Sequence, residues 1–281
     1  MPLRVRRRRL WGLVAAIFVL AAPTPALADY VSLGDSYTAG PLIPLQIQPY
    51  GCLKSDHNYA HLAAAQLGVP LRDPSCSGAE TEDMTAPQGV SPGPNPPQFD
   101  SLSPSTQLVT FTIGGNDIGF SSIAENCVSP SPIGTYCKGD YVHDGRDEIS
   151  ERIAAAAPKV GAVIRGIRER APNARIFALN YAAIFPEQGS LGCWPQLPIA
   201  AGDIDYLRAK QKELNAMIAS EAASNGAGLI DWYQASIGHD ACKPPVIRWV
   251  EPLVPANAAA PAHPNLLGMI GAAKLVVATG R

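Results

Sequence analysis

The sequence has few charged residues and no excess of basic ones. Of its 281 residues 16% are charged, and the formal net charge is −2. A nucleic-acid-binding protein normally displays a basic surface, so this balance excludes nucleic acid as an expected partner. The 47% apolar content is unlike that of a disordered protein, although the chain contains 27 Pro and 25 Gly. Its length allows one large domain or two small ones.

Long apolar runs are also missing, apart from a short one near the N-terminus. Residues 1–28 contain five arginines and no acidic residue, and an apolar run of 13 residues, 10–22, follows the arginines. This run is short for a bilayer-spanning helix. A basic stretch, an apolar stretch and the tripeptide Ala26-Leu27-Ala28 are together typical of a secretory signal peptide. We therefore expect cleavage after Ala28 and a secreted protein, by general or twin-arginine export.

Removal of residues 1–28 makes the charge balance acidic. Residues 29–281 keep 17 of the 22 basic residues and all 24 acidic ones, a net charge of −7. Anionic membrane surfaces are therefore unexpected partners, as nucleic acid already was. No other stretch resembles a membrane span, so we expect a soluble monomer without a stable membrane anchor.

The cysteines lack the spacing of a metal site. There is no Cys-x-x-Cys pair and no Cys/His cluster of the zinc type, so we expect no metal and no other cofactor. All six cysteines lie beyond residue 28, and in an exported protein an even number indicates up to three disulfides, with fifteen pairings possible. A Pro/Gly-rich loop separates Cys127 from Cys137, which favours this local pair. Sequential pairing of the others then gives Cys52–Cys76 and Cys193–Cys242.

Segments typical of strands alternate with segments typical of helices. Short apolar or β-branched runs predict strands over residues 30–33, 107–113, 175–180 and 228–231. Helical composition and spacing predict helices over residues 58–67, 147–171 (with a kink at Pro158), 203–224 and 264–279. This alternation predicts an α/β fold with a parallel sheet covered on both faces. Predicted strands of the same pattern lie on both sides of the Pro/Gly/Ser-rich stretch 86–105. This stretch is therefore interpreted as a surface loop within a single domain.

Small polar clusters follow the predicted strands, where active sites gather in open α/β sheets. The clusters are Gly34-Asp35-Ser36-Tyr37, Cys76-Ser77-Gly78-Ala79 and Gly114-Gly115-Asn116-Asp117, and His263 precedes the last predicted helix. Each is a weak signal alone, because Gly-Asp-Ser arises by chance, Gly-Gly-Asn-Asp is typical of a turn, and a lone His is more often a surface residue. The order of the four along the chain carries the prediction.

These residue types suit acyl transfer. A serine hydroxyl becomes an effective nucleophile when a neighbouring imidazole removes its proton. At a strand-to-helix turn, helix N-terminal N–H groups near Ser36 would favour developing negative charge. Acyl transfer creates an oxyanion, for which Asn supplies an uncharged donor and Gly allows close approach of the backbone. The imidazole of His263 would then protonate the leaving alcohol.

The order of these motifs resembles that of the SGNH (GDSL-type) hydrolase family, particularly its secreted lipases and esterases with three disulfides. The resemblance extends from Tyr30 to the C-terminal helix. It implies a three-layer α/β/α sandwich of flavodoxin-like type over residues 29–281, with about five parallel strands. It also implies that Ser36 is the nucleophile and His263 the general base, with an oxyanion hole from the Gly78 N–H, the Asn116 side chain and the Ser36 N–H.

One position departs from the family pattern. The family usually has Asp three residues before the His, but position 260 is Ala, and no carboxylate lies between Glu251 and His263. Some secreted members of the family use a main-chain carbonyl instead. We therefore expect a Ser36–His263 dyad in which the carbonyl of Ala260 or Pro261 orients the imidazole.

Other acidic residues leave an alternative open. A distant acid, Asp240 or Asp231, would complete a triad with Ser36 and His263. Asp35 and Asp117 are expected to have structural roles, because they lie within the two polar turns and can bond local backbone groups.

The leading hypothesis is a secreted carboxylic ester hydrolase, a lipase or esterase that acts on acyl chains. A phospholipase A-type enzyme or a carbohydrate acetyl esterase would use the same residues, because loops build the substrate pockets. A non-catalytic lipid- or glycan-binding domain predicts loss of a catalytic residue, yet all of them are present. Apolar residues before His263 either line an acyl site or pack the last loop: Trp249, Val250, Pro252, Leu253, Val254 and the Ala/Pro run 258–262.

Overall fold

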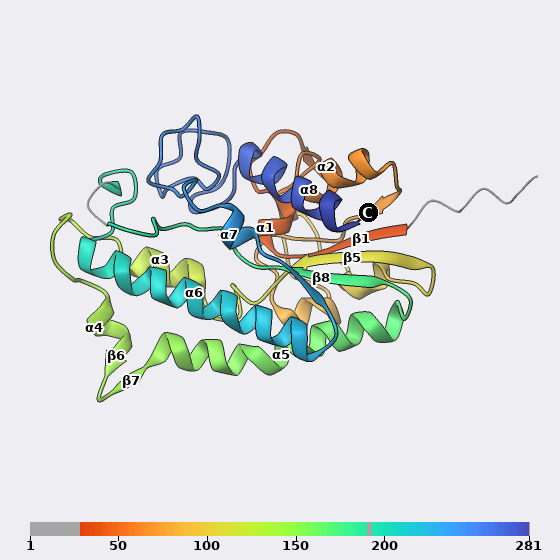
Figure 1. Ribbon diagram of the computed structural model, residues 1–281, viewed down its shortest axis with the longest axis horizontal. Helices are drawn as coiled ribbons and strands as arrows, with labels where there is room; N and C mark the ends of the chain where they lie inside the picture. The colour runs from red at the N-terminus through yellow and green to blue at the C-terminus, as the bar shows by residue number, and fades with distance from the viewer. Residues whose placement is uncertain (1–28, 190–192, 281) are drawn as a thin grey trace, which may run out of the picture.

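A five-stranded parallel sheet lies at the centre of the computed structural model, which describes residues 29–189 and 193–280 (Figure 1). Its strand order is β4–β1–β5–β8–β9. The strands are β1 (Asp29–Gly34), β4 (Leu71–Arg72), β5 (Thr106–Thr112), β8 (Arg175–Leu179) and β9 (Gly228–Ile230). The predicted signal peptide, residues 1–28, lies outside the described residues.

Four of the five strands match the predicted ones. The central strand β5 is buried at every position except Gln107, which explains its nearly continuous run of apolar and β-branched residues. Strand β4 was not predicted, because two residues are too few to show alternation. Two short antiparallel hairpins were also not predicted; they pair β2 (Gln46–Ile47) with β3 (Lys54–Ser55), and β6 (Val142–His143) with β7 (Arg146–Asp147).

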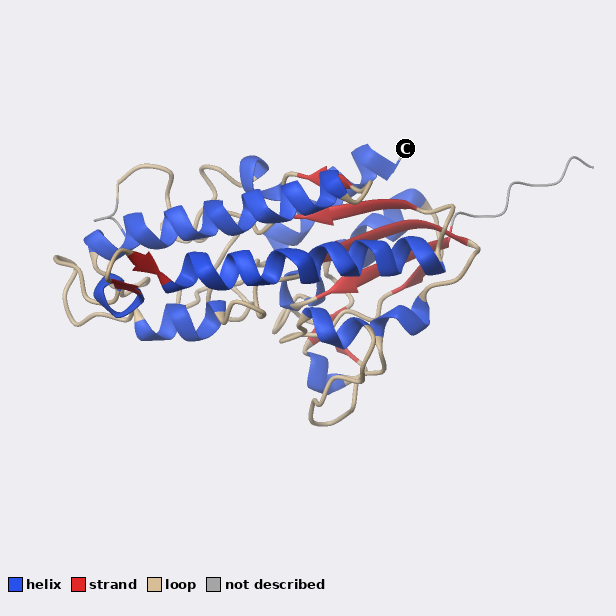
Figure 2. Cartoon of the chain, turned by 90° about the horizontal axis from the view of Figure 1, so that it is seen from below, coloured by secondary structure: helices blue, strands red, loops and turns tan. Residues whose placement is uncertain are grey.

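Long helices cover both faces of the sheet, which confirms the predicted three layers. Helices α2 (Tyr59–Leu67) and α8 (Leu266–Gly280) pack together on one face, and α5 (Glu148–Arg170) and α6 (Ala201–Ser224) lie side by side on the other (Figures 1 and 2). The side chain of Asn58 accepts a hydrogen bond from the His61 N–H and so caps α2, and Asp147 caps α5 in the same way. Helix α5 continues through Pro158.

The shorter helices lie in the connections between these layers. They are α1 (Ser36–Ala39), α3 (Phe120–Asn126), α4 (Lys138–Tyr141) and α7 (Trp232–Ala235), with 3-10 turns at η1 (Tyr50–Cys52), η2 (Thr81–Met84) and η3 (Gln98–Ser101). Gln98 anchors the long loop 86–105, because its buried amide bonds both the N–H and the C=O of Gly34 at 2.7 and 2.9 Å. No helix in the described ranges has the length and apolar character needed to cross a bilayer.

The order of the strands fixes where a ligand can bind. The chain passes from β1 outward to β4 and then returns to β5 on the other side of β1, so the direction of winding reverses between β1 and β5. In doubly wound sheets ligands bind at such a reversal, outside the carboxyl ends of the strands. Gly34 pairs with Thr112 at these two ends, which brings the turns after β1 and β5 together.

Three disulfides tie down the loops around this edge. They join Cys52 to Cys76, Cys127 to Cys137, and Cys193 to Cys242, the same pairs that sequential pairing gives. The first holds the turn after residue 75 beside β1, where the Cys76 N–H donates to the Gly34 carbonyl at 3.0 Å. Loops on the ligand-binding side of the sheet are therefore braced covalently.

Candidate active site

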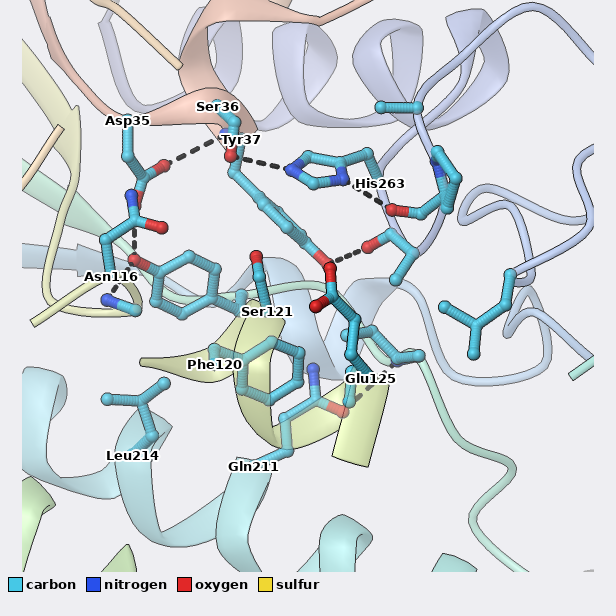
Figure 3. A pocket seen from close by; sticks show the side chains of 18 residues that line it. Asp35, Ser36, Tyr37, Asn116, Phe120, Ser121, Glu125, Gln211, Leu214 and His263 are labelled. Carbon is cyan, nitrogen blue, oxygen red and sulfur yellow. Dashed lines mark hydrogen bonds between the residues drawn. The ribbon is translucent and has the colours of Figure 1, made fainter. Parts of the chain in front are cut away.

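Ser36 and His263 lie within hydrogen-bond distance, although 227 residues separate them in the sequence (Figure 3). Ser36 is the first residue of α1, directly after β1, and Asp35 caps this helix by accepting a bond from the Tyr37 N–H at 2.9 Å. The Ser36 Oγ lies 2.7 Å from the His263 Nε2. The predicted strand-to-helix turn thus presents the hydroxyl to an imidazole, as nucleophilic catalysis requires.

A main-chain carbonyl orients the imidazole. The His263 Nδ1 lies 2.7 Å from the Pro261 carbonyl, and because a carbonyl only accepts, Nδ1 carries the proton and Nε2 is free to accept from Ser36. The Ala260 carbonyl accepts the backbone N–H of His263 at 3.2 Å instead. Of the two carbonyls considered from the sequence, Pro261 therefore contacts the ring.

The two distant acids make their hydrogen bonds elsewhere. Asp231 caps α7 and bonds the Asn180 amide at 2.8 Å, and Asp240 accepts from the Cys242 N–H at 3.1 Å. Neither carboxylate contacts His263. Asp117 bonds the N–H and hydroxyl of Thr81, so it holds two turns together as a structural residue would.

Burial lowers the pKa of His263 below its ordinary value of 6.5, and the bond to the Pro261 carbonyl offsets this only in part. The imidazole is consequently neutral at pH 7, which is the form that accepts a proton.

Of the three predicted oxyanion donors, Ser36 and Asn116 are among the residues that line one cavity, and Gly78 is not. Within the described residues, the N–H groups of Ser36 and Gly78 have no hydrogen-bond partner. Asn116 lines the same cavity as Ser36, and its Nδ2 donates one hydrogen to the Ala79 carbonyl at 2.8 Å, which leaves a second hydrogen uncommitted. Gly78 has φ = +81°, a conformation that favours glycine in this turn.

A cavity of about 220 Å³ opens beside the Ser36 hydroxyl. Helices α3 and α6 supply the wall opposite Ser36, through Phe120, Ala124 and Leu214, and Figure 3 shows the Phe120 and Leu214 side chains across the cavity from His263. Of the apolar residues before His263, four also line it: Leu253, Ala260, Pro261 and Ala262. The wall is mostly apolar, as a site for a hydrocarbon group requires.

Four apolar residues of the segment 249–254 are not among those that line the cavity: Trp249, Val250, Pro252 and Val254. Val250 is fully buried, Val254 borders a separate hollow, and the Trp249 ring stacks on His239 at 4.6 Å. Of the two interpretations of this stretch, packing of the loop therefore holds for Trp249 and Val250, and lining of the cavity holds for Leu253 and residues 260–262.

A buried glutamate that no sequence pattern indicated holds the loop of His263. Glu251 is fully buried, and its carboxylate pairs with the Arg248 guanidinium at 2.8 Å and accepts from the Asn265 amide at 2.7 Å. Its own N–H donates to the His263 carbonyl at 2.9 Å. Burial alone would raise the pKa of Glu251, but these and neighbouring donors lower it, so the carboxylate stays charged and bonded.

Tyr37, the residue after Ser36, also contacts His263. The Tyr37 ring packs against the imidazole with centroids 5.3 Å apart, and its hydroxyl donates to the Ala262 carbonyl at 2.8 Å. Within residues 29–189 and 193–280, no group of three or more His, Cys, Asp or Glu residues could hold a metal ion.

Known proteins share this arrangement of the chain. The model of the GDSL-like lipase/acylhydrolase family matches residues 32–269. Lipase 2 of Streptomyces coelicolor is 40% identical over an alignment of 289 positions, gaps included, which covers 95% of each chain. A lipase of Streptomyces rimosus is 29% identical over 83% of this chain and 79% of its own length.

Solved structures agree with these sequence relatives. The phospholipase A1 of Streptomyces albidoflavus NA297 superimposes with a TM-score of 0.71 at 25% identity, covering 91% of this chain and 99% of its own. The extracellular lipase of Streptomyces rimosus gives a TM-score of 0.70 at 25% identity, covering 90% and 99%. The chain therefore belongs to the GDSL-like lipase/acylhydrolase family and is a carboxylic ester hydrolase.

Proposed function

We propose that the protein is an exported serine hydrolase that cleaves esters of acyl chains through a Ser36–His263 dyad. The observation that carries this proposal is the 2.7 Å contact between the Ser36 Oγ and the His263 Nε2 beside an apolar cavity. The Pro261 carbonyl replaces the carboxylate of a triad, because it fixes the tautomer and orientation of the imidazole without adding a charge.

Acylation begins when the His263 Nε2 takes the proton of the Ser36 hydroxyl as Oγ attacks the acyl carbon. The carbonyl oxygen becomes an oxyanion, which the Ser36 and Gly78 N–H groups and the Asn116 amide stabilise. The bond from the acyl carbon to the alcohol oxygen then breaks, and the imidazolium gives its proton to that oxygen. A water molecule repeats the sequence on the acyl-enzyme, releasing the carboxylic acid and restoring Ser36.

The cavity favours an acyl chain over a small acetyl group. Its volume of about 220 Å³ exceeds what an acetyl group fills, and its apolar wall gains free energy from each buried methylene. Phospholipid deacylation is the second candidate substrate class, because the solved phospholipase A1 matches 91% of this chain.

A panel of esters tests this proposal. Hydrolysis by the purified protein, with its disulfides intact, is measured on p-nitrophenyl esters of increasing acyl length, on phosphatidylcholine and on acetylated oligosaccharides. We expect kcat/KM to rise from acetyl to longer acyl chains. A maximum on acetylated oligosaccharides would contradict the acyl-chain proposal, and a maximum on phosphatidylcholine would assign the second candidate.

The pH dependence reports the group that orients His263. Because burial lowers the pKa of this imidazole, kcat/KM for an uncharged ester is expected to fall with decreasing pH, with its midpoint below 6.5. A carboxylate on Nδ1 would instead raise the pKa of the imidazole. A midpoint clearly above 6.5 in the measured profile would therefore contradict the carbonyl-oriented dyad.

Export and a monomeric state complete the proposal. The tripartite pattern of residues 1–28, the three disulfides and the extracellular lipase of Streptomyces rimosus support secretion. The partner would be an ester substrate of low molecular weight or a lipid, bound without a membrane anchor or nucleic acid.

A further inference from the structure

A buried tyrosine hydroxyl joins the turn that carries Ser36 to the turn that carries Asn116. Tyr181 follows strand β8, and its hydroxyl donates to the Asp35 Oδ2 while it accepts the Gly115 N–H at 2.7 Å. Asp35 directly precedes Ser36, and Gly115 directly precedes Asn116. One hydroxyl therefore bonds the neighbour of the proposed nucleophile and the neighbour of a proposed oxyanion donor.

The position of Tyr181 is itself fixed from α6. The Tyr181 N–H donates to the Asn215 Oδ1 at 2.9 Å, and the Asn215 Nδ2 donates back to the Tyr181 carbonyl at 2.9 Å. The Tyr181 ring meets the Tyr37 ring edge-on, with centroids 4.9 Å apart. Burial and a bonded backbone leave the hydroxyl little freedom, so it can act as a rigid reference point for both turns.

Asp35 needs the hydroxyl of Tyr181 as a donor. Its carboxylate is almost completely buried and accepts from the Tyr37 N–H, the Thr112 hydroxyl and the Tyr181 hydroxyl. Burial raises the pKa of Asp35 to about 6, so the group is mostly charged at neutral pH and loses stability with each missing donor.

The backbone of Gly115 and the Tyr181 side chain lie too close together to leave room for a Cβ atom at position 115. A Cβ atom at position 115 would lie 2.8 Å from the Tyr181 hydroxyl oxygen and 2.9 Å from its Cζ. The second glycine of Gly114-Gly115-Asn116-Asp117 is therefore required by contact with Tyr181, which explains why the motif carries glycine at this position.

We infer that Tyr181 is a positioning residue for ester hydrolysis, which sets the distance between the Ser36 nucleophile and the Asn116 oxyanion donor. The inference rests on the proposed function of these two residues. Because a displacement of a donor weakens transition-state binding more than substrate binding, loss of the hydroxyl should lower kcat and leave KM nearly unchanged.

The test is a double-mutant cycle on Tyr181→Phe and Asn116→Ala. We expect Tyr181→Phe alone to lower kcat roughly 10- to 100-fold and Asn116→Ala alone roughly 100- to 1,000-fold. In the Asn116→Ala background, Tyr181→Phe should cost at most about threefold, because the donor it positions is gone. The affinity of a boronic acid, which forms a tetrahedral adduct on Ser36, should fall in parallel with kcat.

Tyr30→Phe is the matched control. Tyr30 is a fully buried tyrosine at the start of β1, and its hydroxyl bonds Thr110 at 2.6 Å, away from the site. Like Tyr181→Phe, Tyr30→Phe should lower the melting temperature, but its kcat should stay within about twofold of the wild-type value. If Tyr181→Phe does not fold, Gly115→Ala disrupts the contact between Gly115 and the Tyr181 hydroxyl instead. Combined with Asn116→Ala, it should show the same loss of kcat alone and the same small further loss in the double variant.

The outcomes separate the inference from the proposed function. An impaired Asn116→Ala beside a fully active Tyr181→Phe would overturn the positioning role and leave the proposed function standing. If the two losses of kcat multiply in the double variant, the positioning role is overturned as well, because Tyr181 would then act independently of Asn116. Full activity of Asn116→Ala would overturn the donor role of Asn116 and, with it, the positioning role of Tyr181, whereas the Ser36–His263 dyad is tested separately by Ser36→Ala.

Discussion

Replacement of Ser36 by alanine is expected to lower kcat for ester hydrolysis by about a millionfold, the loss seen when a serine nucleophile is removed. Among the described residues, the Ser36 Oγ has one side-chain partner, the His263 Nε2, and Ser36 is only partly buried. Loss of the Ser36 hydroxyl leaves the N-cap of α1 intact, because the Asp35 side chain provides that cap. The variant should therefore fold normally and lack the nucleophile.

The matched control for this prediction is Ser121→Ala. Ser121 lines the same cavity from α3 and has no contact with His263 (Figure 3), so its loss should change kcat by no more than a few-fold. Rates on a p-nitrophenyl ester and labelling by a fluorophosphonate, read by mass spectrometry, measure both variants. Labelling should map to Ser36 in the wild type and disappear in Ser36→Ala. Activity that survives in Ser36→Ala would refute the nucleophile.

Replacement of His263 by alanine is expected to cost nearly as much as loss of Ser36, because the two act as one unit. Asp240→Asn and Asp231→Asn should leave kcat within a few-fold of the wild type, since neither carboxylate contacts the imidazole. A triad acid would instead contribute about 1,000- to 10,000-fold.

The comparison of these three variants separates a dyad from a triad. Thermal unfolding is measured alongside kcat, because Asp240 is buried and caps the Cys242 N–H, so its amide variant is expected to affect stability more than rate. A loss of about 1,000-fold in kcat for Asp240→Asn, at unchanged stability, would refute orientation by Pro261.

Much of the fold was predictable because its parts are coded locally. The run 107–113 forms the central strand β5, and Asn58 and Gly68 bound helix α2 as capping residues do. Strand β4 could not be predicted, because a two-residue edge strand depends on its pairing with β1 and not on its own pattern. The same holds for the two hairpins.

The site was predictable where a motif follows a strand. Ser36, Asn116 and His263 all line the cavity, and Tyr181 follows strand β8, so the rule for strand ends would have marked it. The cavity wall could not be predicted, because α3 and α6 approach each other only in the fold. Glu251 left no sequence signal either, since its partners come from the irregular loop 248–265.

The separation of Ser36 and His263 by 227 residues makes the order of synthesis matter. The serine lies near the start of the described residues, and the histidine lies just before helix α8. A chain that is still being synthesised and has not yet reached residue 263 cannot bring the two together. Ester cleavage through these two residues therefore requires that the chain from Ser36 to His263 has been completed and has folded.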